Sequence, residues 1–318
     1  MDPGLRRDDI RAIRYGIGPY SPLGMGSIVP DFPAGRPTPP TVTPAKDARP
    51  PAGHGVHRSF STPVLYAPPM IEWSDEGIVL SARRHGESAA IVSLLTRGHG
   101  RHVGLVRGGA GRRARGLYEP GNRVTAAWRA RLAEHLGHYA CELAESRVAR
   151  VLDDAARLAG LAAATALVDA ALPEREPHGR LFDSLDALIL GLCDEAAAVD
   201  WRTAYVRFEL DLLADLGFGL DLSRCAATGT TADLAYVSPK TGRAVSLSAG
   251  EPYRDRLLPL PRFLSQASLP AAAADLLAGL HLTGVFLEQY AFAHRPPGAG
   301  GPLPAARDRL LAVLRRVA

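Results

Sequence analysis

The feature that most restricts the fold is a series of five short β-type runs, separated by glycine-containing segments, in the first half of the chain. The runs cover residues 76–81, 89–96, 101–107, 124–128 and 138–143. Glycines in the segments 84–87 and 97–100 supply the positive φ that tight hairpins need. Five short strands with one long connection, residues 108–121, predict an OB-type β-barrel.

Beyond residue 148 the apolar residues recur at helical spacing. Helices are expected at 152–172, 181–193, 201–216, 271–292 and 305–317. The third is the clearest, because Trp201, Tyr205 and Phe208 begin one apolar face. The sequence therefore predicts an α+β multidomain protein. Its parts are an OB domain at 70–147, a helical domain at 148–222 that residues 251–318 complete, and a small β-containing insertion at 223–250.

Residues 1–69 contain 14 of the 26 prolines and show neither helical nor alternating periodicity. Such a segment cannot bury enough apolar surface to offset the entropy of ordering, so we expect a disordered extension. An alternative is that translation begins at Met70, immediately before the first strand-like run. No apolar run is long enough to span a bilayer. The three cysteines form no CxxC pair, which favours a reducing, cytoplasmic location without disulfides.

An arginine-rich stretch between residues 107 and 131 is the strongest functional signal. Residues 71–150 carry a net charge of +5, whereas residues 151–318 carry −4. Guanidinium groups bind phosphate oxygens in pairs, and an interleaved aromatic face can stack on an unpaired base for about 1–3 kcal/mol. The alternative is a solvated basic loop with Trp128 in the barrel core. The candidate DNA-binding residues are Arg107, Arg112, Arg113, Arg115, Arg123, Arg129, Arg131 and Tyr118.

Other chemistry is poorly represented in the sequence. The glycines at 108–111 lack the GK[ST] ending of a nucleotide-binding loop. His135 and His138 have no third ligand at metal-binding spacing, and Cys225 is a lone cysteine. We therefore expect no catalytic residues, no metal and no cofactor, and hence no enzyme.

Several short motifs, in order along the chain, resemble the bacterial RecO DNA-repair family. They are Gly77-Ile78-Val79-Leu80, Glu87-Ser88, Leu216-Gly217-Phe218, Cys225, Leu282-Thr283-Gly284 and Leu303-Pro304-Ala305-Ala306-Arg307. The resemblance covers residues 70–318. It implies an OB domain, a helical bundle and a zinc-ribbon-like insertion. Some family members bind zinc there through four cysteines, but 223–250 holds only Cys225, so we expect a degenerate insertion without metal.

The resemblance also implies a function in the RecF recombination pathway. Proteins of this family bind single- and double-stranded DNA and anneal complementary strands. They contact RecR and the C-terminal tail of single-strand-binding protein, and so act indirectly on RecA at the nucleoid in the cytoplasm. Two other hypotheses remain open: a protein-interaction scaffold with incidental DNA contact, and a metal hydrolase, for which the sequence lacks ligand clusters.

Overall fold

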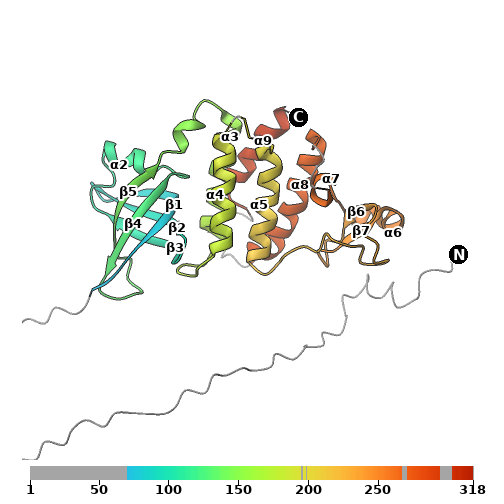
Figure 1. The fold of residues 1–318 in the computed structure, drawn as a ribbon, viewed down its shortest axis with the longest axis horizontal. Helices are drawn as coiled ribbons and strands as arrows, with labels where there is room; N and C mark the ends of the chain where they lie inside the picture. The colour runs from blue at the N-terminus through green and yellow to red at the C-terminus, as the bar shows by residue number, and fades with distance from the viewer. Residues whose placement is uncertain (1–69, 195, 198, 267–270, 294–302, 318) are drawn as a thin grey trace, which may run out of the picture. The chain divides into compact units, whose positions relative to one another are not determined.

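The structure is a computed structural model that describes residues 70–194, 196–197, 199–266, 271–293 and 303–317. The prediction of disorder in residues 1–69 lies outside the described residues. The described residues belong to one compact unit, in which a β-sheet region precedes a group of helices (Figure 1). The predicted α+β order is confirmed.

Five strands form the N-terminal part of this unit. They are β1 (Ile71–His85), β2 (Ala89–Thr96), β3 (Gly100–Val106), β4 (Arg123–Ala130) and β5 (His138–Glu145). They close into a barrel in the order β1-β2-β3-β5-β4. All five strands lie where the sequence predicts them, and the largest difference is β1, which is longer at both ends.

Strand β1 belongs to both sides of the barrel because it bends in the middle. Its first half pairs with β4 and its second half pairs with β2, both antiparallel. The register shifts between Val79 and Ser81, which marks a bulge that turns the strand. At the bend, Val79 N–H donates to Asn122 O at 2.9 Å and Gly121 N–H donates to Val79 O at 2.8 Å.

The helical part follows η1 (Val148–Arg150). Its longer helices are α3 (Ala155–Ala171), α4 (Gly179–Cys193), α5 (Trp201–Asp215), α8 (Ala273–Phe286) and α9 (Ala305–Val317). Helix α8 continues into the π-helix η3 (Leu287–Ala291). Helix α3 packs against α9, and α4 packs against α5 (Figure 1). These helices also agree with the predicted segments.

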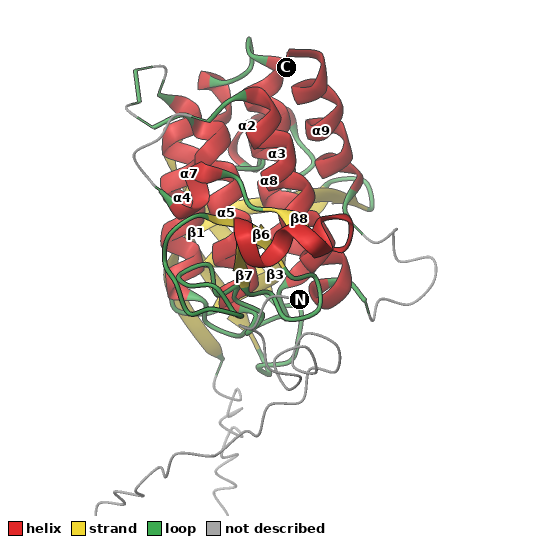
Figure 2. Cartoon of the chain, turned by 90° about the vertical axis from the view of Figure 1, so that its right-hand side faces the viewer, coloured by secondary structure: helices red, strands yellow, loops and turns green. Residues whose placement is uncertain are grey.

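Between α5 and α8 lies the small insertion. Its elements are β6 (Leu234–Val237), β7 (Ala244–Ser246), α6 (Leu247–Gly250), η2 (Glu251–Arg256), β8 (Leu258–Pro259) and α7 (Arg262–Ser265). The strands form a three-stranded sheet in the order β7-β6-β8, and β8 packs beside α8 (Figure 2). The sequence predicts a β-containing insertion at 223–250. Strand β8 lies beyond these bounds, comprises two residues and depends on β6 for its pairing.

Two apolar clusters fill the unit. One lies inside the barrel around Val92, Leu94 and Trp128. The other fills the helical bundle and also takes in Ile78 and Leu95 from β1 and β2. The outer wall of the barrel on that side is therefore part of the bundle core, which leaves the β4 and β5 side of the barrel for other contacts.

A buried ion pair joins three of the bundle helices. The Arg307 guanidinium on α9 donates to Glu209 on α5 at 2.6 and 2.8 Å, and both side chains are almost fully buried. Arg307 also donates to Leu280 O on α8 at 2.6 Å, and the Thr283 hydroxyl donates to the same Glu209 carboxylate. A charge buried this deeply needs such partners, so the pair fixes how α5, α8 and α9 pack.

Candidate nucleic-acid interface

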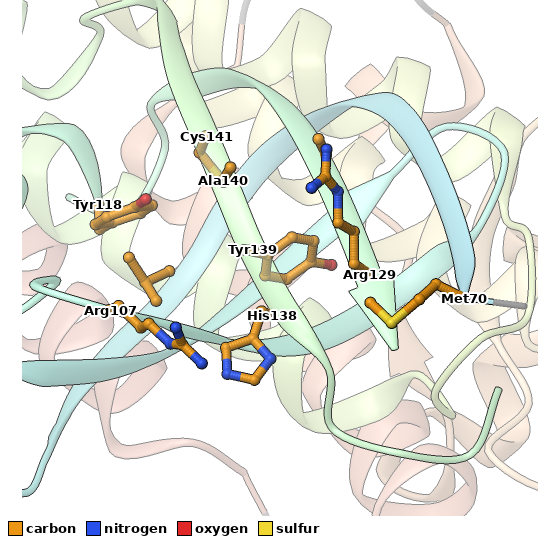
Figure 3. Close-up of a pocket in the computed structure, with 10 residues that line it drawn as sticks. Met70, Arg107, Tyr118, Arg129, His138, Tyr139, Ala140 and Cys141 are labelled. Atoms are coloured by element: carbon orange, nitrogen blue, oxygen red, sulfur yellow. The ribbon is translucent and has the colours of Figure 1, made fainter. Parts of the chain in front are cut away.

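A hollow of about 610 Å³ opens on the barrel beside β5 (Figure 3). Within the described barrel, β3 and β5 pair only at Leu105 and His138, where Leu105 N–H donates to Gly137 O at 3.1 Å. Beyond this point β5 continues without β3, which leaves room for the hollow. Its lining residues are Met70, Val106, Arg107, Tyr118, Ala127, Arg129, His138, Tyr139, Ala140 and Cys141.

Alternation along β4 and β5 decides which side chains reach this surface. Arg129 lies opposite His138, and both are exposed. Trp128, between these outward positions, lies opposite Tyr139 and is 1% exposed in the barrel core. The alternative interpretation of Trp128 as a core residue is therefore confirmed. Its indole N–H donates to Leu136 O at 3.1 Å.

Tyr118 forms the inner wall of the hollow. Its side chain is 5% exposed and packs in the barrel core, and its hydroxyl hydrogen-bonds with the Cys141 thiol. Burial raises the pKa of Tyr118 far above its usual range, and burial raises that of Cys141 to about 11 although the Tyr118 hydrogen bond opposes this. Tyr118 thus lines the hollow but does not present an exposed stacking face.

The connection between β3 and β4, which the sequence predicts as one long segment, contains a short helix, α2 (Arg112–Leu117). Tyr118 anchors the end of this helix in the core, and Tyr118 N–H donates to Ala114 O at 3.1 Å. The buried Asn122 amide donates to Gly116 O at 2.8 Å and to Leu117 O at 3.3 Å, which satisfies two of its last carbonyls. These tertiary contacts order the segment without a ligand.

Exposed arginines gather around the hollow and on α2. Arg107 follows β3 and lines the hollow, and Arg112 and Arg115 project from α2 into solvent. Arg131, just beyond β4, is also exposed. Arg129 lines the hollow and pairs with Glu72 at 3.2 Å, but both side chains are 65% exposed, so this pair contributes little. The side chain of Arg113 lies outside what the structure describes.

Arg123 lies apart from the exposed arginines around the hollow. Its guanidinium lies 2.8 Å from Asp186 on α4 and 2.5 Å from Glu76 on β1, and it lies over the Phe182 ring at 5.6 Å. These partners raise the pKa of Arg123 despite partial burial. Arg123 therefore faces the helical bundle, and its charge is already compensated there.

Two other barrel arginines also form ion pairs with carboxylates of the helical part. Arg97 pairs with Asp183 at 2.7 Å, and Arg101 lies 3.4 Å from Asp169 and 3.2 Å from Glu174. Asp169 also accepts hydrogen bonds from two barrel hydroxyls, those of Ser81 and Ser93. Arg97, Arg101 and Arg123 on the bundle side are thus paired with carboxylates, whereas Arg129 is the one arginine of the hollow with a carboxylate partner in the described structure.

His138, Ala127 and Ala140 were not singled out as site residues by the sequence. The sequence offers no third metal ligand for His138, and in the structure its side chain is exposed. The signal that could have found these residues is the antiparallel register of β4 and β5, which places His138 opposite Arg129 and Ala140 opposite Ala127. That register depends on the turn at 131–137, whose length the periodicity of the two strands does not specify.

Cys225 lies in the insertion and is 1% exposed. Burial opposes ionisation, but hydrogen bonds from Ser246 and Thr228 lower the pKa of the thiol to about 6; Ser246 N–H lies 3.2 Å from the sulfur. A structural zinc site needs four ligands. Among the described residues, no three metal-binding side chains lie together, so the donor set around Cys225 does not fit zinc.

Over the ranges described, none of the helices has the length and apolarity needed to cross a bilayer.

Two family models match the chain. The model described as Recombination protein O N terminal matches residues 70–147, and the model described as Recombination protein O C terminal matches residues 152–297. Similar curated proteins carry the name DNA repair protein RecO. The one from Rhodospirillum centenum is 57% identical over 243 residues, covering 76% of this chain and 94% of the relative.

Two further relatives have the same name. The protein from Rhodospirillum rubrum is 53% identical over 250 residues, covering 78% of this chain and 98% of the relative, and that from Methylobacterium nodulans is 52% identical over 248 residues, covering 76% and 98%. These matches place the chain in the class of DNA repair and recombination proteins. It belongs to the Recombination protein O family, and the resemblance found in the sequence is confirmed.

Proposed function

We propose that this chain is a non-enzymatic DNA-binding mediator of homologous recombination, and that the exposed arginines around the hollow contact phosphates. The observation that carries this proposal is the division of the barrel arginines into two groups. Within the described ranges, Arg107, Arg112, Arg115 and Arg131 have no carboxylate partner, whereas arginines facing the bundle are paired. Unpaired guanidinium groups in one region attract phosphate.

The barrel architecture supports an OB-type assignment. The strand order β1-β2-β3-β5-β4 with a bent first strand is that of a five-stranded OB-type barrel, and α2 occupies the connection between β3 and β4. OB barrels commonly bind single strands with a basic groove. The proposed DNA-binding residues include Arg113, because it lies in α2. They exclude Arg123, whose side chain contacts the helical bundle, and Tyr118, whose side chain packs in the barrel core. The insertion is proposed to be a ribbon-like module that no longer holds metal.

Membership of the Recombination protein O family supports a more specific proposal for the activity and partners of this protein. We infer that the protein anneals complementary strands and helps to load recombinase onto strands coated by single-strand-binding protein, in the cytoplasm at the nucleoid. Its expected partners are single- and double-stranded DNA, RecR, the C-terminal tail of single-strand-binding protein, and indirectly RecA. The name of the relatives, DNA repair protein RecO, agrees with a function in DNA repair.

Strand annealing tests the proposal. Complementary oligonucleotides, one of them labelled with a quenched fluorophore, are mixed with the protein, with and without the cognate single-strand-binding protein. We expect faster annealing in both cases. If the protein accelerates neither reaction and binds no DNA at physiological salt, the mediator proposal is wrong and the scaffold hypothesis is favoured.

A further inference from the structure

We propose that the hollow beside β5 is a recess for one unpaired nucleobase, so that the interface selects single strands over duplex DNA. This inference rests on the proposed DNA contact and adds a base subsite to it. The floor of the recess consists of Ala127 on β4 and Ala140 on β5, which we call the alanine floor.

The alanine floor exists because two small residues lie opposite one another on the outward face of the sheet. Ala127 pairs with Ala140, and their neighbours along the same face are Arg129 and His138, which also pair with one another. A pair of methyl groups flanked by two long side chains makes a depression on the sheet. The inward neighbours Trp128 and Tyr139 are buried and keep the floor in place.

The walls suit a flat heteroaromatic ring with a phosphate on either side. Met70, Val106 and Tyr118 contribute apolar surface, and the His138 imidazole provides an aromatic face of the kind on which bases stack. Arg107 and Arg129 lie at the rim among the labelled side chains of Figure 3. Among the described lining residues none is a carboxylate, and Glu72 lies beside the rim as the exposed partner of Arg129. A nucleic-acid strand, which carries a flat base between phosphates, fits these walls.

Duplex DNA keeps its bases stacked inside the helix and cannot place one in a recess without the cost of unstacking. It can still contact the exposed arginines of α2 through its phosphates. The recess therefore adds affinity for single strands alone. The expected gain is about tenfold, within the range that stacking of one base on a protein surface provides.

Filling the recess tests this inference. Ala127→Ile and Ala140→Ile place a larger side chain on the outward face, where it does not enter the barrel core. Thr125→Ile is the matched control, because Thr125 lies on the same face of β4, two residues from Ala127, and does not line the hollow. Thermal unfolding of all three variants checks that the barrel is intact.

The probes are a labelled oligothymidine, a strand of equal length made of abasic units, and a duplex of equal length. We expect Ala127→Ile and Ala140→Ile to weaken oligothymidine binding about tenfold and to leave duplex and abasic-strand binding within about twofold, while Thr125→Ile changes none of them. Wild-type protein should bind the abasic strand about tenfold more weakly than oligothymidine.

Unchanged oligothymidine binding by both filled variants, or an equal loss on the duplex, would overturn the base recess. The arginine variant Arg107→Ala, Arg112→Ala and Arg115→Ala, measured in parallel, separates the two proposals. If that variant loses binding to every probe while the filled variants keep it, the phosphate contact stands and the recess is wrong. If the arginine variant binds every probe normally, the DNA contact itself is wrong.

Discussion

At the scale of single residues, the most unusual environment belongs to His102 on β3. Its side chain is 3% exposed, and within the described structure its Nδ1 has no hydrogen-bond partner. It meets Trp73 and Trp128 edge-on, at centroid distances of 5.0 and 4.8 Å. Burial, together with the nearby positive charge of Arg175, lowers the pKa of His102 to about 4. The folded barrel therefore holds a neutral imidazole.

This environment makes the barrel less stable at acidic pH. The unfolded His102 binds a proton near pH 6.5, whereas the folded residue does so near pH 4, so the unfolded state binds more protons between these values. The free energy of unfolding should fall by roughly 3 kcal/mol from this group as the pH decreases through that interval. Urea unfolding of wild type and His102→Leu measures this effect, of which about 2 kcal/mol should develop between pH 7 and pH 5. Parallel pH dependences in the two proteins would contradict the assignment.

The buried ion pair in the bundle gives a second prediction. Glu209→Met leaves the Arg307 guanidinium buried without its carboxylate, which should cost about 3–5 kcal/mol of unfolding free energy. The double variant Glu209→Met with Arg307→Met removes both charges and should recover much of this loss. Chemical denaturation measures each variant, and the exposed Arg315→Met on α9 serves as the control. A double variant no more stable than Glu209→Met alone would be the contrary result.

The contacts of individual side chains were the hardest feature to predict from the sequence. Arg123 and Arg107 are the same residue type within one basic stretch, but Arg123 meets Asp186, which is 63 residues away in the chain, and Arg107 meets no carboxylate among the described residues. Composition and spacing contain no information on partners at such separations. Tyr118 could not be placed for the same reason, because its burial depends on the closing of the barrel.

At the scale of elements, Asn122 holds α2 in place. Its side chain is fully buried, its amide donates to two carbonyls of α2, and its Oδ1 accepts from Arg147 N–H at 2.8 Å. Asn122→Ala leaves these buried groups unpaired, at a cost of about 1–3 kcal/mol for each group that stays unsatisfied. We expect faster hydrogen exchange at the amides of Arg115 and Tyr118. Unchanged exchange, equal to that of a Thr125→Ala control, would show that α2 is ordered by other contacts.

The longer elements could be predicted because their periodicity is local. All five strands and the longer helices follow from alternation or from helical spacing, whereas α2 has six residues and is too short for a periodic signal. Its order comes from Asn122 and Tyr118, which lie outside the helix. Strand β8 and helix α7 are similarly short, and their positions depend on neighbouring strands and helices.

At the scale of the whole molecule, charged contacts join the barrel to the helical bundle. Asp186 on α4 accepts from Arg123 and from Arg147, and the Arg147 side chain is 1% exposed. Asp186→Ala leaves that buried guanidinium with Glu145 as its remaining carboxylate, and should cost about 3–5 kcal/mol. Asp183→Ala is a matched control on the same helix, because its pair with Arg97 is exposed and should contribute under about 1 kcal/mol. Thermal unfolding compares them, and equal losses would contradict this distinction.

The ion pairs between the barrel and the helical bundle explain why the sequence predicts a basic surface but overestimates its extent. The net charge of +5 in residues 71–150 indicated a basic surface, but much of it is compensated by Asp169, Asp183 and Asp186 across the contact with the bundle. The basic region is therefore smaller than the sequence indicates. Among its exposed arginines, Arg107, Arg112 and Arg115 lie at the hollow and on α2.

The salt dependence of single-strand binding shows whether the exposed arginines of the barrel contact DNA phosphates. Fluorescence anisotropy of a labelled oligothymidine gives the slope of log affinity against log salt for wild type and for the variant Arg107→Ala, Arg112→Ala and Arg115→Ala. Each lost phosphate contact reduces the magnitude of the slope by about 0.7, so the variant should show a slope smaller by about 2. Arg315→Ala with Arg316→Ala on α9 should leave it unchanged. An unchanged slope in the barrel variant would contradict the assignment of these arginines to the DNA interface.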